Sequence, residues 1–128
     1  MEYGMSRTIN RPFEEVDQEV RAVLADKGFG VVTEIDMQAT LRNKIGVEID
    51  PQIILGVCNP NFANRALKAE PSIGLLLPCN VVIRKTDSGT VVDMINPQMM
   101  AEITAAPEMK QIADEVTELL SGALANLK

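Results

Sequence analysis

The chain has 128 residues, a formal net charge of −6 at pH 7 and no histidine. Without histidine it cannot itself form a Ser-His-Asp triad, a Cys-His pair or an imidazole metal site, so its general acids and bases are carboxylates, lysine, tyrosine and thiols. The acidic balance and the aromatic content of 3% argue against nucleic acid as a partner, because phosphate binding needs a basic footprint and base stacking needs exposed rings.

The same pattern argues against a membrane partner. No apolar run approaches the ~20 residues of a membrane span, and the first residues lack the basic and then apolar pattern of a leader. An acidic chain is also poorly suited to an anionic membrane surface. We therefore expect a cytoplasmic protein folded as a single domain over residues 1–128, with aliphatic side chains and seven methionines filling its core.

The first segment predicts a strand followed by an amphipathic helix. Residues 2–9 alternate as in a half-buried strand, with Arg7 as a charged exception on the apolar face. That face carries Tyr3, Met5 and Ile9. Asn10 is the expected N-cap of the helix, and Gly28 is its expected end.

A second strand and a short helix follow. Strand 29–35 is expected to place Phe29, Val31 and Ile35 on one side. Asp36 is a candidate cap for a helix over residues 36–44. A loop over residues 46–51 then leads into the central part of the chain.

The central stretch, residues 53–83, contains both cysteines. The apolar strand 53–58 meets Asn59-Pro60, where asparagine is a favoured N-cap and proline suits the first helical position. The helix ends at Glu70-Pro71, because a residue before proline is disfavoured in the α region. Strand 79–85 and strand 90–95 are expected to form a hairpin around the turn residues Asp87-Ser88-Gly89.

The last segment predicts the longest helix, over residues 107–127. It follows a short turn that Asn96 is expected to cap. A wide apolar stripe indicates that this helix lies across a sheet, and surplus apolar surface on it would favour a homodimer. The stripe consists of Met109, Ile112, Ala113, Val116, Leu119, Leu120, Ala123, Leu124 and Leu127.

This order of elements predicts an α+β domain. A curved, mostly antiparallel sheet would pack its helices on one face, with the long C-terminal helix among them. A ferredoxin-like sandwich is the alternative.

The candidate site follows from that arrangement. If the strands that end at Cys58 and begin at Cys79 are antiparallel neighbours, both thiols lie at one edge of the sheet, next to the start of the helix after Pro60. A helix N-terminus favours anions and lowers thiol pKa values. Asn59 and Asn80 would add amide groups, and Lys44 would add positive charge from the preceding loop.

The two cysteines also have simpler interpretations. Free cysteine is among the most buried residue types, so core packing is the ordinary role. A reactive thiol pair, a disulfide and a metal site are the alternatives. A disulfide is disfavoured in a reducing cytoplasm, and two sulfurs without histidine supply only half of a tetrahedral metal site. We therefore predict no metal.

The sequence resembles an uncharacterised family, domain of unknown function 302. The resemblance covers nearly the whole chain and implies a fold of the TATA-binding-protein-like class (β-α-β4-α), without implying DNA binding. It supplies no catalytic residue, substrate or cofactor. The residues that carry it are Lys27-Gly28-Phe29-Gly30, Leu55-Gly56-Val57-Cys58-Asn59-Pro60, Ala66-Leu67, Leu75-Leu76-Leu77-Pro78-Cys79-Asn80-Val81-Val82 and Ile95-Asn96-Pro97.

Three functions are consistent with these observations. The first is a non-enzymatic module that binds a small, anionic ligand or a partner near Cys58, Asn59, Cys79 and Asn80. The second is a redox carrier or enzyme that uses Cys58 as thiolate and Cys79 as resolving thiol. The third is an accessory subunit that docks through an exposed apolar patch on the 107–127 helix.

Overall fold

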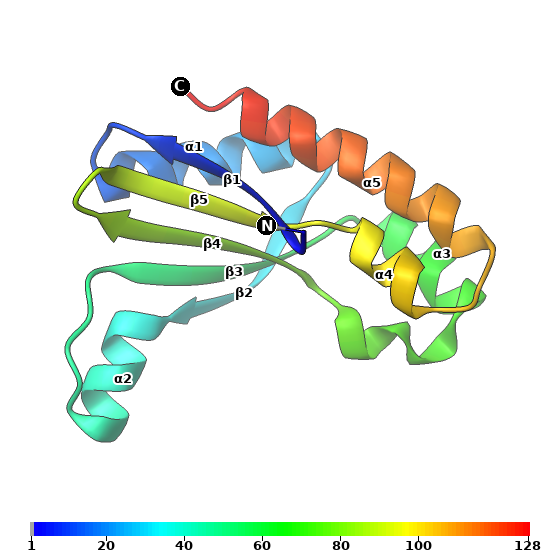
Figure 1. Cartoon of the computed structure of the whole chain (residues 1–128), viewed down its shortest axis with the longest axis horizontal. Coiled ribbons are helices and arrows are strands. Elements are labelled where there is room, and N and C mark those ends of the chain that lie inside the picture. Colours follow the sequence, from blue (N-terminus) through cyan, green and yellow to red (C-terminus); the bar gives the residue numbers. More distant parts are fainter. Residues whose placement is uncertain (1) are drawn as a thin grey trace.

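The computed structural model describes residues 2–128, in which five strands form one sheet in the order β1-β5-β4-β3-β2 (Figure 1). Every neighbouring pair of strands is antiparallel. A ferredoxin-like sheet has four strands with the first strand in its interior, whereas here β1 lies at the edge of a five-stranded sheet, so the ferredoxin-like alternative is wrong. The strands are β1 (Gly4–Ile9), β2 (Gly30–Asp36), β3 (Gln52–Cys58), β4 (Cys79–Thr86) and β5 (Gly89–Ile95).

Helices α1 and α5 pack against each other and against the same face of the sheet, which places the core between that face and this helical layer. The helices are α1 (Phe13–Asp26), α2 (Met37–Ile45), α3 (Pro60–Ala69), the 3-10 helix η1 (Pro71–Leu76), α4 (Gln98–Ile103) and α5 (Glu108–Ala125). This arrangement confirms the expected α+β domain with a long C-terminal helix.

The apolar stripe of α5 is buried inside the domain. The large side chains of Met109 and Leu120 are fully buried, and Ile112 and Val116 are each only 4% exposed. None of the large apolar side chains that are exposed in residues 2–128 belongs to α5. Helix α5 therefore lacks the exposed apolar surface that we expected to bind a second copy or another partner.

Arg7, the charged exception on the apolar face of β1, caps the end of α5. Its Nη1 atom donates to the carbonyl oxygens of Leu124 at 2.9 Å and Leu127 at 2.5 Å. Cations are stabilised at helix C-termini, where carbonyl groups lack partners within the helix. The apparent break in the pattern thus joins the first strand to the last helix.

Two local expectations were wrong. Helix α1 starts at Phe13 with Pro12 in the capping position, so Asn10 lies two residues too early to act as its cap. Strand β2 has an irregularity between Val31 and Thr33. An extra residue in one strand reverses the alternation, so Ile35 faces away from Val31 and is 44% exposed.

Gly56 allows a close approach on the other face of the sheet. A Cβ atom at this position would lie 2.2 Å from Thr33 Oγ1 and 2.6 Å from Pro78 Cγ. The proline ring belongs to the segment that leads into β4, so its room to move is small. Gly56 therefore lets this segment lie against β3 just before Cys79.

We predict that Gly56→Ala lowers the free energy of unfolding by about 1–3 kcal/mol, because the added methyl group overpacks this contact. Urea unfolding monitored by circular dichroism measures the change. Gly30→Ala is the matched control in a neighbouring strand, since a Cβ atom there would meet nothing within 4 Å. Equal stability of the two variants would show that the contact at Gly56 is unimportant.

Candidate functional site

Asn59 forms the junction between β3 and α3. Its backbone is extended (φ −107°, ψ 113°), and its side-chain oxygen accepts from the N–H groups of Asn61 at 3.0 Å and Phe62 at 3.3 Å. The Ala63 N–H donates to the Asn59 carbonyl at 3.0 Å. The expected cap is confirmed, but it occupies the N–H groups that an anion would need at this helix start.

Gly28, just after the end of α1, lies close to the Asn59 side chain. It has φ +87°, and a Cβ atom on it would lie 2.8 Å from Asn59 Nδ2. Only glycine adopts this backbone conformation at low cost and leaves space for the amide. The turn after α1 therefore holds the Asn59 side chain against the start of α3.

Cys58 and Cys79 lie together at one end of the sheet, as expected if their two strands are antiparallel neighbours. Val57 is paired with Cys79, so the last residue of β3 lies beside the first residue of β4. Both thiols are free; Cys58 is half-buried and Cys79 is 8% exposed. Burial, with a smaller contribution from Cys58, raises the pKa of Cys79 to about 11. At neutral pH Cys79 is therefore a protonated thiol.

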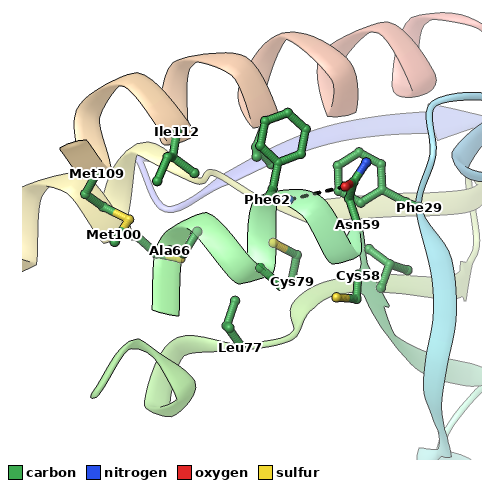
Figure 2. A pocket seen from close by; sticks show the side chains of 13 residues that line it. Phe29, Cys58, Asn59, Phe62, Ala66, Leu77, Cys79, Met100, Met109 and Ile112 are labelled. Atoms are coloured by element: carbon green, nitrogen blue, oxygen red, sulfur yellow. Dashed lines mark hydrogen bonds between the residues drawn. The ribbon is translucent and has the colours of Figure 1, made fainter. Parts of the chain in front are cut away.

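The two cysteines and Asn59 line a small apolar pocket between the end of β3 and the helices α3, α4 and α5 (Figure 2). The pocket has a volume of about 30 Å³, and no Lys, Arg, Asp or Glu side chain lines it. Its other lining residues are Phe29, Val57, Phe62, Ala63, Ala66, Leu77, Met100, Met109, Ile112 and Val116. The surroundings favour an uncharged occupant.

Arg65 fastens α3 to α5 beside this pocket. Its guanidinium group lies 5.3 Å from the centre of the Phe62 ring, and its Nη2 atom is 2.7 Å from Glu115 Oε2. The hydrogen bond that Arg65 donates to the Glu115 carboxylate raises the pKa of Arg65. Phe62 is thereby held over the pocket by a cation–π contact and an ion pair.

Asn80 and Lys44 are not brought to the pocket. Asn80 follows Cys79 in a strand, so it points to the opposite face of the sheet, where it is exposed and lines a different hollow. Lys44 is exposed in the last turn of α2, near the start of β3. Because β3 has seven residues, roughly 20 Å of strand separates that end from Cys58.

Sequence reasoning missed most of the pocket wall. Phe62 and Ala66 were expected only as part of the helix that begins at Asn59-Pro60, and Met100 and Met109 only among the methionines that fill the core. Apolar residues that line a pocket have the same spacing as apolar residues that fill a core. Of these four residues, the motifs that carry the family resemblance include only Ala66.

Two kinds of feature are absent from residues 2–128. No group of three or more His, Cys, Asp or Glu side chains is placed to hold a metal ion. No helix in this part of the chain has the length and apolar character needed to cross a membrane.

Comparison with known proteins shows similarity to one family over nearly the whole chain. The structure matches the crystal structure of an uncharacterized conserved protein DUF302 from Bacillus stearothermophilus with a TM-score of 0.92, 26% sequence identity and 100% coverage of both chains. No curated protein matches the sequence. The model of the family described as domain of unknown function DUF302 matches residues 5–127. The chain belongs to the DUF302 family.

Proposed function

We propose that this protein is a non-catalytic binding module that takes a small, uncharged, apolar group into the pocket beneath Phe62. One observation carries the proposal. A pocket at the junction of β3 and α3 is lined by apolar side chains and by a cysteine that burial keeps protonated. Two free thiols also suit the reducing cytoplasm, which is the location we infer for the protein.

The pocket contains few groups that could act in catalysis. The thiolate is the reactive form of cysteine, and Cys79 is a thiol at neutral pH, which makes it a poor resolving group. The chain contains no histidine, and no carboxylate or lysine lines the pocket to act as a general base. These features support the binding role over the thiol enzyme or redox carrier.

An anionic ligand is disfavoured for similar reasons. The N–H groups in the first turn of α3 are already bound by Asn59, and Lys44 lies at the far end of β3. Moving a charge into apolar surroundings without a partner is costly. We therefore replace the expected anion with an uncharged ligand.

The size of the pocket limits the ligand. A volume of about 30 Å³ is enough for roughly two water-sized groups. Met100 and Met109 line one side, and methionine side chains adapt to the shape of an occupant. A short aliphatic group is the chemical class that fits.

Xenon is the probe that tests the pocket directly, because it binds in apolar cavities. We expect dissolved xenon to shift the methyl NMR signals of Val57, Leu77 and Ile112 in a saturable manner. Ala63→Leu should abolish these shifts, because the larger side chain occupies the pocket.

Ala22→Leu is the control, since Ala22 is exposed on α1 and does not line the pocket. It should leave the response to xenon unchanged. If the native protein shows no saturable shifts at these three methyl positions, the pocket does not admit an apolar group and the proposal fails.

Thiol labelling separates the binding module from the thiol enzyme. In the native protein at neutral pH, we expect iodoacetamide to label the half-buried Cys58 well before Cys79, which should react only after denaturation. Peptide mass spectrometry measures each site separately. Rapid labelling of Cys79 in the folded protein would instead support thiol chemistry.

The raised pKa of Cys79 predicts a loss of stability at alkaline pH. The thiol ionises at its ordinary value of 9.0 when unfolded and at about 11 when folded, so its stabilising contribution is complete below about pH 9 and is lost as the pH rises to about 11. The full effect is on the order of 2–3 kcal/mol. Urea unfolding across this range should show a steeper decline for the native protein than for Cys79→Val. Identical slopes would contradict the burial of an ionisable thiol.

A further inference from the structure

The sheet has a face without a covering helical layer. Helices α1 and α5 lie on the face that carries Leu55, Val81 and Val92, and the strand register assigns the alternate residues to the other face, called here the open face. Apart from the terminal pair Gly30 and Cys58, its residues are Gly4, Ser6, Thr8, Thr33, Ile35, Gln52, Ile54, Gly56, Asn80, Val82, Arg84, Thr86, Gly89, Val91, Asp93 and Ile95.

The composition of the open face is unusual for a surface in water. Charged residues make up 23% of the chain, yet Arg84 and Asp93 are the only charged residues on this face. Its middle strands carry the aliphatic side chains of Ile54, Val82 and Ile95. A solvated face of an antiparallel sheet is normally polar, and depletion of charge is typical of the centre of a protein interface.

The two charges lie side by side near the middle of the open face. Arg84 is in β4, the central strand, and its Nε atom donates to Asp93 Oδ2 at 3.2 Å. The Asp93 side chain is 22% exposed, and its Oδ1 atom is buried without a hydrogen-bond partner in residues 2–128. Arg84 is 42% exposed, so it remains accessible from outside the chain.

A hollow of about 340 Å³ lies next to this pair. It is lined by Tyr3, Asn80, Val82 and Ile95 as well as by the two charged residues. Tyr3 is 62% exposed at the edge of the face. The open face therefore combines an apolar centre, a paired positive and negative charge, and unfilled space.

We propose that the open face binds a second copy of this chain, face to face. A positive and a negative group that lie side by side are self-complementary about a two-fold axis. Such an axis would place Arg84 of each copy over Asp93 of the other copy. A two-fold dimer uses the same patch on both subunits, so one ion pair in the monomer becomes a reciprocal pair of contacts. This proposal is independent of the pocket beneath Phe62, which faces the helical layer.

The size of the open face sets the expected strength of the dimer. Five strands spaced roughly 4.8 Å apart and about 20 Å long cover roughly 500 Å² on each copy. The total of roughly 1,000 Å² is at the lower limit for a specific interface. We therefore expect a dimer that dissociates on dilution.

Charge reversal combined with mixing tests the reciprocal contact. Sedimentation equilibrium of the native protein should show monomers at low concentration and dimers at high concentration. Arg84→Asp puts two negative charges on the open face, and Asp93→Arg puts two positive charges there. Each variant alone should dimerise at least tenfold more weakly than the native protein, and an equimolar mixture of the two should recover dimers.

Lys110→Asp is the control, because it breaks an exposed ion pair within α5, on the helical side of the sheet, and should leave dimerisation unchanged. If either charge variant fails to fold by circular dichroism, Asn80→Glu adds a charge to the same face without removing the Arg84–Asp93 pair and should also yield monomers. A native protein that stays monomeric at the highest concentration overturns the proposal. The proposal is also overturned if the folded charge variants dimerise as strongly as the native protein. It is overturned as well if the equimolar mixture of Arg84→Asp and Asp93→Arg does not recover dimers.

Discussion

The junction at Asn59 is the constraint on which the candidate site depends. A buried strand becomes a helix there without an intervening loop, so one side chain has to replace the hydrogen bonds that the first turn lacks. Gly28 holds the same side chain from the end of α1. The position of α3, and with it of Phe62 above the cysteines, follows from these two contacts.

The layered architecture separates two surfaces with different chemistry. On the helical side, α3, α4 and α5 surround a small pocket that contains both thiols and is lined by no charged side chain. On the open face, the only charges form a pair in an otherwise neutral surface. Because successive residues of a strand point to opposite sides, Cys79 and Asn80 belong to different surfaces although they are adjacent in the sequence.

The elements that could be predicted from the sequence were those with a clear period and a clear end. The stripe of α5 and the junction at Asn59 are examples, since burial and capping both act locally. The irregularity in β2 was not predictable, because it depends on the pairing with β3. The grouping of Cys58 with Cys79 could be derived from antiparallel pairing. The grouping of Asn80 and Lys44 with them failed because it ignored side-chain alternation and the length of β3.

The contacts of β1 have a consequence for the order of assembly. Its partner in the sheet is β5, and Arg7 binds a carbonyl group 117 positions later in the chain. On the ribosome, β2 and β3 become available to each other early, whereas β1 has no neighbour until residues 89–95 have been made. Closing such a long loop is entropically costly. Strand β1 therefore cannot pair in the sheet until β5 has been made, and Arg7 then binds the end of α5.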